Sequence, residues 1–374
     1  MKNKFQCIYL IVISLGLNFL FIKCSNTSQK DIIEQEETPQ IIAYYAGGKN
    51  AIDQYDLNGL NQLIYSFLHL KGNELAIDNE SDSLTLMYLT GLKSKYPKLK
   101  VLVSLGGWTG CKTCSEVFST DKGRKDFAIS TARIIEQYNA DGIDLDWEYP
   151  VVPGPPGHPY SEEDRDNFTM LIKELKAIMK PDDILSFAAG GFHSYLERSI
   201  DWKTVMPMID HVNIMSYDLY GGYSKQTGHH TPLYSNDQQN KSADQAVNYL
   251  LELGVPANQI VIGAAFYGRI WKDVPDINNG LYQSGKFFKG VGFKDWEKLE
   301  PGYNFYWDNA SKAPYAYNKD KGYFFTFDDS LSVTYKTEYV KNKKLKGIMF
   351  WQLMNDRPQN GLLSAMIKSA RSTK

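Results

Sequence analysis

Short apolar segments recur along most of the chain, and each of them is bounded by Gly, Pro or Asp. They are rich in β-branched and aromatic residues, a composition that favours β-strands. Helix-like stretches separate many of them, and strands that alternate with helices predict a parallel sheet in an α/β fold. The predicted strands are residues 41–45, 63–70, 101–105, 142–147, 184–189, 212–217, 260–267 and 347–353.

The spacing of these segments predicts a closed (β/α)8 TIM barrel, a fold that commonly needs about 250 residues. Predicted helices lie at residues 121–138, 161–180 and 242–253, and the second opens with a capping-box pattern at Ser161. The regular spacing breaks once, between Arg269 and Gly347. We therefore expect a small α+β insertion subdomain over residues 270–327, between strands seven and eight, and then a helix around residues 330–344.

The composition excludes several classes of protein. The 374 residues include 41 Lys and Arg against 43 Asp and Glu, for a net charge of −2, so no basic stripe favours a nucleic-acid partner. A hydrophobic content of 43% with 22% charged residues is ordinary for a globular protein and argues against disorder and against several membrane spans. We expect a monomer. The aromatic share of 13% must serve a large core or a surface that stacks on flat ligands.

The N-terminus reads as an export signal. Lys2 and Lys4 precede an apolar run that ends at Ile22, which is typical of a secretory signal peptide over residues 1–24. Cys24 follows the run directly and resembles the lipid-attachment site of bacterial lipoproteins. Residues 25–39 are polar and acidic, as in a solvated tether, and we expect the folded domain over residues 40–374. We expect an exported protein, anchored through Cys24 at the cell envelope or outer membrane, with plain secretion and an uncleaved membrane anchor as the alternatives.

Cys111 and Cys114 form a lone CxxC. A tetrahedral zinc site would need a second pair of ligands, and no thioredoxin-like context favours a redox role. In an exported protein, a local disulfide between the two is the simplest interpretation. The chain has no glycine-rich phosphate loop after the first strand and no HExxH motif, so we expect no cofactor and no metal. The paired residues His229 and His230 are expected at the surface, where they could border a substrate.

The fourth predicted strand carries Asp144, Asp146 and Glu148 at alternate positions. Alternate residues of a strand face the same way, roughly 6–7 Å apart, so the acids point into the barrel while Ile143 and Leu145 point out. Buried neighbouring carboxylates cannot all ionise cheaply, so at least one pKa rises, as a general acid requires. A solvent-facing acidic strand, a structural ion-pair site and a Ca²⁺ or Mg²⁺ site are weaker alternatives, the last because acids on one straight strand diverge.

The run from Asp141 to Pro150, DGIDLDWEYP, resembles the DxxDxDxE signature of glycoside hydrolase family 18, the chitinase family. The resemblance implies that Glu148 is the general acid and that Asp146 orients and stabilises the 2-acetamido group of the substrate. It implies further that Asp144 supports Asp146, while Asp141 opens the signature.

Other segments match the same family in order. The resemblance gives Tyr217 a catalytic part, as the donor of a hydroxyl hydrogen bond to the acetamido carbonyl. Residues expected at the substrate are Tyr44, Ser104, Gly107, Trp108, Tyr149, Met215, Asp218, Tyr267, Arg269 and Trp351.

The family is a substrate-assisted exception among retaining glycosidases. The resemblance therefore implies a retaining chitinase that cleaves β-1,4 linkages between N-acetylglucosamine units, with chitin or related N-acetylglucosamine glycans as its partner. Two alternatives stay open: an endo-β-N-acetylglucosaminidase acting on N-glycans or peptidoglycan-related glycans, and a non-catalytic chitin-binding lectin. Endo and exo action are not distinguished.

Overall fold

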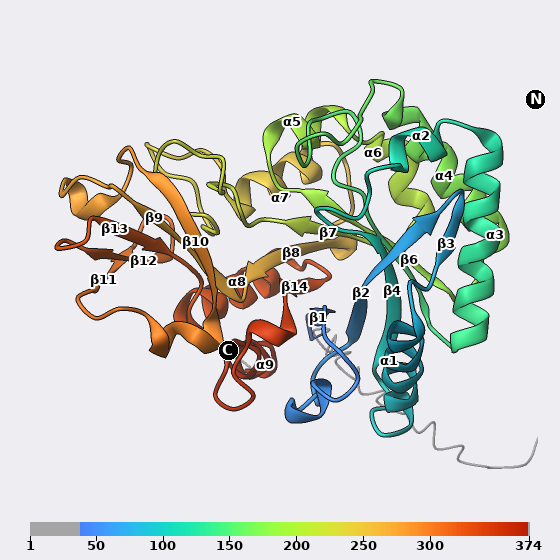
Figure 1. Ribbon diagram of the computed structural model, residues 1–374, viewed down its shortest axis with the longest axis horizontal. Helices are drawn as coiled ribbons and strands as arrows, with labels where there is room; N and C mark the ends of the chain where they lie inside the picture. The colour runs from blue at the N-terminus through green and yellow to red at the C-terminus, as the bar shows by residue number, and fades with distance from the viewer. Residues whose placement is uncertain (1–37, 373–374) are drawn as a thin grey trace, which may run out of the picture. The chain divides into compact units, whose positions relative to one another are not determined.

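A barrel of eight parallel strands is the centre of the part of the chain that the structure, a computed structural model, describes, residues 38–372 (Figure 1). The signal peptide, Cys24 and the tether up to residue 37 lie outside the described residues and stay predictions. Pairing of β1 with both β2 and β14 closes the barrel and confirms the predicted (β/α)8 fold. Its strands are β1 (Gln40–Tyr45), β2 (Gln62–Lys71), β4 (Lys100–Gly106), β5 (Gly142–Asp146), β6 (Ile184–Gly190), β7 (His211–Met215), β8 (Ile260–Ala265) and β14 (Gly347–Trp351).

Helices follow most of the barrel strands. They are α1 (Glu80–Gly91), α2 (Cys114–Phe118), α3 (Asp121–Tyr138), α4 (Asp164–Ile178), α5 (His193–Arg198), α6 (Trp202–Val205), α7 (Ala243–Glu252), α8 (Ser330–Lys343) and α9 (Leu362–Arg371). Side-chain caps set several starts: the Thr120 hydroxyl caps α3 and the Ser242 hydroxyl caps α7. The second predicted helix begins later than expected, because the carboxylate of Asp164 accepts the Ser161 N–H and holds a turn before α4.

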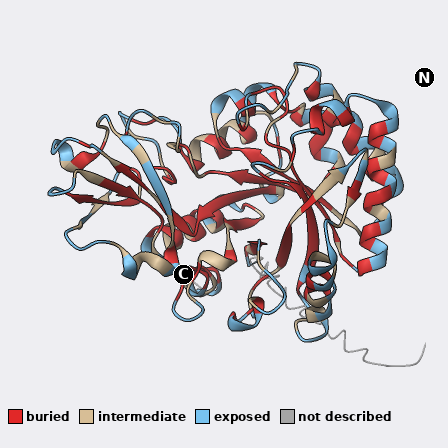
Figure 2. Ribbon diagram, in the orientation of Figure 1, coloured by how far each residue is buried: buried red, intermediate tan, exposed pale blue. Residues whose placement is uncertain are grey.

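The barrel strands are buried (Figure 2), and the hydrophobic core of the barrel forms two layers. One layer fills the inside of the barrel, and the other lies between the strands and the helices. Ile143 and Leu145 belong to the outer layer, as predicted. The ring of Trp147 packs there at 5.4 Å from Phe118 and 6.3 Å from Phe168. The acids that alternate with these residues on β5 therefore face the interior.

A separate antiparallel sheet follows β8. Its order is β10-β9-β13-β12-β11, and it is formed by β9 (Tyr267–Lys272), β10 (Lys286–Gly292), β11 (Asn304–Asp308), β12 (Ala313–Asn318) and β13 (Tyr323–Thr326). Its helical content among the described residues is limited to short 3-10 turns at Asn278–Gly280 and Phe293–Lys298. The seventh predicted strand was too long, because β8 ends at Ala265 and Tyr267 already belongs to this second sheet. A short strand, β3 (Glu74–Ala76), pairs antiparallel with β2.

Candidate active site

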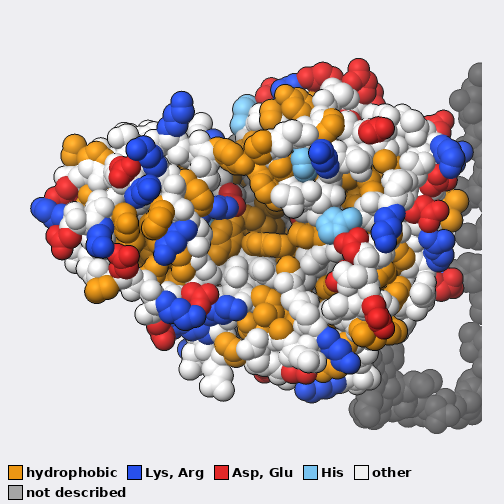
Figure 3. All heavy atoms as spheres, in the orientation of Figure 1, with side chains coloured by type: hydrophobic (Ala, Val, Ile, Leu, Met, Phe, Trp, Pro, Cys, Tyr) orange, Lys and Arg blue, Asp and Glu red, His pale blue; other side chains and the backbone are white. Residues whose placement is uncertain are grey.

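A cleft of about 880 Å³ lies at the carboxyl ends of the barrel strands, where reactive groups of such barrels are found. Figure 3 shows hydrophobic side chains gathered in a hollow near the middle of the view. The cleft is lined by Phe67, Trp108, Asp146, Glu148, Tyr149, Pro153, Phe192, Met215, Tyr217, Asp218, Gly221, Gly222, Tyr223, Tyr267, Arg269, Phe287, Gly290, Val291, Gly292, Trp351 and Asn355. Barrel loops and the strand β10 of the second sheet both contribute walls.

Asp144 lies below the cleft, fully buried on β5. Burial raises its pKa, and hydrogen bonds to the carboxylate oppose that shift. Its four donors are the Tyr44 hydroxyl at 2.8 Å, the Ser186 hydroxyl at 2.6 Å, the Asn213 amide at 3.0 Å and the Ser104 hydroxyl at 3.4 Å. Both carboxylate oxygens of Asp144 are therefore fully hydrogen-bonded, which fixes this side chain next to Asp146.

Asp146 occupies the next inward position and lines the cleft. Burial raises its pKa well above the usual value, and the charges of Glu148 and Asp144 add to that shift. Its Oδ1 atom is buried and accepts no hydrogen bond from the described residues. A buried acceptor without a donor is costly, so this atom is suited to a ligand N–H.

Glu148 follows β5 and reaches the cleft, with 8% of its side chain exposed. Burial raises its pKa to about 7, and the charge of Asp218 adds to that shift. A carboxyl group with such a pKa carries a proton near neutral pH and can deliver it, as a general acid must. The row Asp144, Asp146 and Glu148 thus holds three acids with pKa values all displaced upward.

Asp218 lies three residues after the end of β7, and its pKa is shifted in the opposite direction. Burial opposes its ionisation, but hydrogen bonds from Arg269 and His230 more than offset that effect, so its pKa is lowered. The Arg269 guanidinium contacts both carboxylate oxygens, and the Tyr267 hydroxyl donates to Oδ2 at 2.8 Å. Tyr267 and Arg269 are the first residues of β9, so this cluster joins the barrel to the second sheet. Asp218 is a fixed anion on the cleft wall.

Aromatic rings form much of the remaining surface. Trp351, at the end of β14, stacks on Phe67 with ring centroids 5.4 Å apart and planes at 16°. Trp108 is 40% exposed and meets the edge of Tyr149 at 6.3 Å. The Tyr217 ring meets Tyr267 at 6.2 Å. Flat apolar faces beside charged and hydroxyl groups suit a ligand that has both, such as a sugar ring.

Most of the residues expected at the substrate lie in this cleft, and three do not. Those that line it are Trp108, Tyr149, Met215, Asp218, Tyr267, Arg269 and Trp351, together with the catalytic candidates Asp146, Glu148 and Tyr217. Tyr44 and Ser104 instead lie beneath it, where their hydroxyls bind Asp144. Gly107 makes room: a Cβ at this position, with φ of +77°, would lie 2.4 Å from the Phe67 ring.

Several residues of the site were not predicted. Phe67 lines the cleft from β2, Tyr223 from a loop and Phe287 from β10, and no local pattern marks them. Ser186 and Asn213 had a usable signal, because each is a polar residue at an inward position of an apolar strand. The expected surface position of His229 and His230 is wrong. Both are fully buried: His229 Nε2 lies 3.0 Å from Asp308 and His230 Nδ1 lies 3.4 Å from Asp218.

Cys111 and Cys114 are joined by a disulfide in the loop after β4. The described residues contain no group of three or more His, Cys, Asp or Glu side chains that could hold a metal ion. Asp141, the first acid of the signature, lies at the opposite end of β5, where it accepts the Val101 N–H and pairs with Lys93 and Lys100. Within residues 38–372, no helix is both long and apolar enough to cross a membrane.

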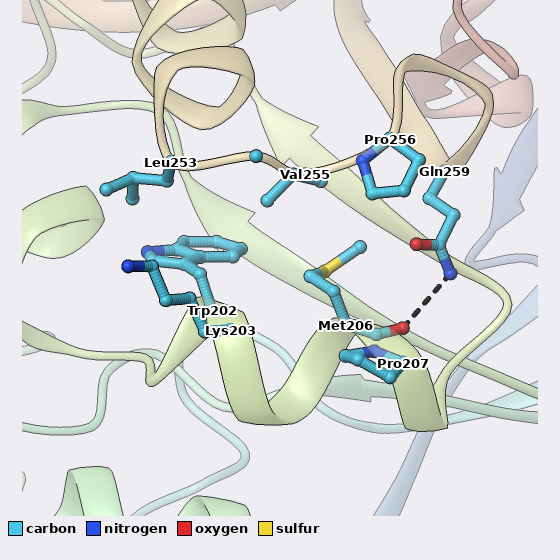
Figure 4. A pocket seen from close by; sticks show the side chains of 9 residues that line it. Trp202, Lys203, Met206, Pro207, Leu253, Val255, Pro256 and Gln259 are labelled. Carbon is cyan, nitrogen blue, oxygen red and sulfur yellow. Dashed lines mark hydrogen bonds between the residues drawn. The ribbon is translucent and has the colours of Figure 1, made fainter.

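A second, smaller pocket of about 350 Å³ has a different character (Figure 4). It lies beside α6 and the turn between α7 and β8, where Trp202, Met206 and Val255 supply an apolar lining. The Gln259 amide donates to the Met206 carbonyl oxygen at 3.0 Å. No carboxylate lines this pocket, whereas those of Asp146, Glu148 and Asp218 line the large cleft.

A (β/α)8 barrel with a row of carboxylates at an aromatic cleft is an arrangement that suits a glycoside hydrolase. Within that class, the chain belongs to glycoside hydrolase family 18: the family model described as "Glycosyl hydrolases family 18" matches residues 40–356.

Known proteins resemble the chain over most of its length. Chitinase A1 of Niallia circulans is 35% identical over 296 residues, which are 72% of this chain and 42% of that protein. A family 18 N-acetylglucosaminidase from Paenibacillus barengoltzii is 34% identical, with a TM-score of 0.78 over 88% of this chain and 99% of that one. Chitinase ChiA74 from Bacillus thuringiensis is 27% identical, with a TM-score of 0.83 over 90% and 71% of the two chains. The chain spans about half the length of the curated relatives it matches.

Proposed function

We propose that the protein is a chitinase that hydrolyses β-1,4 linkages between N-acetylglucosamine units of chitin or chito-oligosaccharides. The proposal rests on two neighbouring acids, Asp146 at the carboxyl end of β5 and Glu148 just after it. Burial raises the pKa of Glu148 to about 7, and Asp146 beside it presents a buried oxygen that has no donor among the described residues. The first group can protonate a leaving oxygen, and the second can accept the N–H of a 2-acetamido group. Relatives named as chitinases agree with this substrate.

The cleft favours substrate assistance over a protein nucleophile. Only Asp146, Glu148 and Asp218 supply carboxylates among the residues that line it. Asp218 is engaged by Arg269 and Tyr267, and Asp146 projects from the same strand face as Glu148 rather than from across the sugar. A double displacement needs two carboxyl groups on opposite sides of the scissile bond. The acetamido oxygen of the substrate fills that place.

The proposed reaction has two steps, closure of an oxazolinium ring and its hydrolysis. The acetamido oxygen attacks the anomeric carbon, forms a C–O bond and closes an oxazolinium ring. The glycosidic C–O bond breaks, its electron pair goes to the leaving oxygen, and Glu148 gives that oxygen a proton. Asp146 stabilises the positive N–H of the ring, and the Tyr217 hydroxyl fixes the acetamido carbonyl. Glu148 then takes a proton from water, whose oxygen attacks the anomeric carbon. The C–O bond between that carbon and the acetamido oxygen breaks, its electron pair returns to the acetamido group, and the product keeps the β configuration.

The test is the substitution Glu148→Gln, which keeps the shape of the side chain and removes its acid. We expect hydrolysis of chitotetraose to fall by about 10²-fold or more, the usual contribution of a general acid, while binding is kept. The matched control is Glu252→Gln at an exposed position on α7, which should hydrolyse at the normal rate. Near-normal hydrolysis by the Glu148 variant would rule out the assignment. Proton NMR of the first product should show the β anomer, and inversion would contradict the mechanism.

A second candidate follows from the Paenibacillus barengoltzii structure, whose protein is named an N-acetylglucosaminidase. Mass spectrometry of products from chitin oligosaccharides, chitosan, peptidoglycan fragments and a high-mannose glycopeptide separates the candidates. Release of N-acetylglucosamine monomers alone would favour the N-acetylglucosaminidase. Cleavage of the glycopeptide would favour an endo-β-N-acetylglucosaminidase, and binding without any product would favour a lectin.

A further inference from the structure

The loop after β4 brings Trp108 into the cleft, where its aromatic neighbours are Tyr149 and Tyr223. The side chain is 40% exposed. Its ring contacts are Tyr149 at 6.3 Å and Tyr223 at 6.2 Å, both with tilted or edge geometry, and Tyr223 is itself 72% exposed. Such contacts hold a ring weakly, so the position of Trp108 depends on the backbone of its own loop.

The disulfide between Cys111 and Cys114 packs directly against that backbone. A Cβ placed on Gly106 would lie 3.1 Å from the Cys111 sulfur and 2.4 Å from the carbonyl oxygen of Asp146. The Gly106 backbone is thus enclosed between the disulfide and the strand that bears the catalytic acids. The Gly107 N–H donates to the same Asp146 oxygen at 2.9 Å. These contacts fix the start of the loop on β5 and its end on the disulfide.

The other half of the disulfide is anchored in the barrel. Cys114 is the first residue of α2 and is fully buried. The next residue, Ser115, donates its hydroxyl to the Asp164 carboxylate at 2.7 Å, at the start of α4. Phe118, at the end of α2, packs against Trp147. The disulfide therefore links the loop, which contains the turn between Gly107 and Gly110, covalently to the rigid helix layer.

We propose that this disulfide is a positioning element that holds Trp108 as a preformed stacking surface for an N-acetylglucosamine ring, an inference that rests on the proposed function. A binding surface that is already rigid loses less conformational entropy when a ligand binds. Loss of that rigidity therefore weakens the affinity. Asp146 is the last residue of β5 and Glu148 follows it, and the hydroxyls that bind the neighbouring Asp144 come from Tyr44 and Ser186, outside the loop. Loss of the disulfide should therefore weaken binding of long substrates and leave the chemical step in place.

The first experiment measures the loop without any ligand. Hydrogen exchange of the full chain is compared with that of the double variant Cys111→Ser/Cys114→Ser. The Gly107 and Gly110 amides, both hydrogen-bonded here, should exchange faster in the variant, while the amides of β5 do not change. Unchanged exchange in the loop would overturn the proposal. If the variant fails to fold, the wild type reduced with dithiothreitol under native conditions replaces it.

The second experiment is a double-mutant cycle on chitotetraose binding in the Glu148→Gln background. Trp108→Ala alone should raise Kd by about tenfold, and loss of the disulfide alone by about threefold to tenfold. In the Trp108→Ala protein, loss of the disulfide should add no further change, because the ring it positions is absent. An equal loss in both proteins would mean a general structural role and would overturn the proposal. If no variant binds chitotetraose but the exchange result is as expected, the proposed substrate is contradicted. The role of the disulfide in fixing the loop is then still supported.

Discussion

At the scale of residues, the account depends on two carboxylates of opposite character. Glu148 is buried and its pKa rises to about 7, whereas the pKa of Asp218 is lowered by Arg269 and His230 against the effect of burial. The two environments assign two functions, a proton donor and a fixed anion. The charge of Asp218 also helps to raise the pKa of Glu148, so the anion supports the acid.

The first prediction concerns the alkaline limb of the pH profile. Glu148 acts in its protonated form, and that form is lost as pH rises through its pKa of about 7. We expect kcat/KM on a chitotriose derivative to fall about tenfold per pH unit above that value, since kcat/KM reports the free enzyme. A series of rates between about pH 5 and pH 9 measures it. A profile that stays flat over this range would contradict the role of Glu148.

At the scale of elements, three consecutive residues connect the barrel to the second sheet. His229 contacts Asp308 on β11, His230 contacts Asp218, and the Thr231 hydroxyl donates to Asp328 at 3.0 Å. Asp328 is fully buried, accepts the Ala265 N–H at the end of β8 and pairs with Lys336 of α8 at 2.6 Å. A few carboxylates thus fix the segments before and after the second sheet.

The second prediction tests this junction through Lys336→Met. Removing one partner leaves Asp328 as a buried, uncompensated charge, which we expect to lower the free energy of unfolding by about 3–5 kcal/mol. The surface pair Lys122–Asp126 is the control, and Lys122→Met should leave the free energy of unfolding nearly unchanged. Urea denaturation measures both. Adding Asp328→Asn to Lys336→Met should cost less than the sum of the single losses, and a fully additive result would contradict the pairing.

The barrel elements could be predicted from the sequence because their signals are local. Each strand is a short apolar run with a Gly, Pro or Asp boundary, and α3 runs from Asp121 to Tyr138 as expected. The break between β8 and β9 could not be predicted, because the run through Phe266 and Tyr267 is continuous and only pairing partners distant in the chain divide it. For the same reason the burial of His229 was missed, since its partner Asp308 lies 79 residues away.

The candidate site shows the same division. Asp144 and Asp146 lie on β5 and Glu148 follows two residues after its end, so the alternation of acids in the sequence was enough to predict that they face the same way. Phe67 and Phe287 come from separate parts of the chain, and only the closed fold brings them to one cleft. The support of Asp144 by Ser186 and Asn213 also crosses strands, although the polar residue in each apolar strand was a usable sign.

At the scale of the whole described molecule, the barrel and the second sheet have separate tasks. The barrel buries the acids at the ends of its strands, and the second sheet adds Tyr267, Arg269 and Phe287 to the wall of the cleft. The walls enclose about 880 Å³, within the size range of small-molecule sites. On our proposal, the chemistry depends on the acids that line the cleft and on the acetamido group of the substrate.

The most direct test of this account compares two substrates that differ only in the acetamido group of the sugar at the scissile bond. One is an N-acetylated chito-oligosaccharide, and the other carries a free amine on that sugar. Because the proposed mechanism uses the acetamido oxygen as the nucleophile, we predict hydrolysis of the first and no enzymatic turnover of the second, measured by mass spectrometry of the products. Comparable cleavage of both substrates would contradict the proposed mechanism.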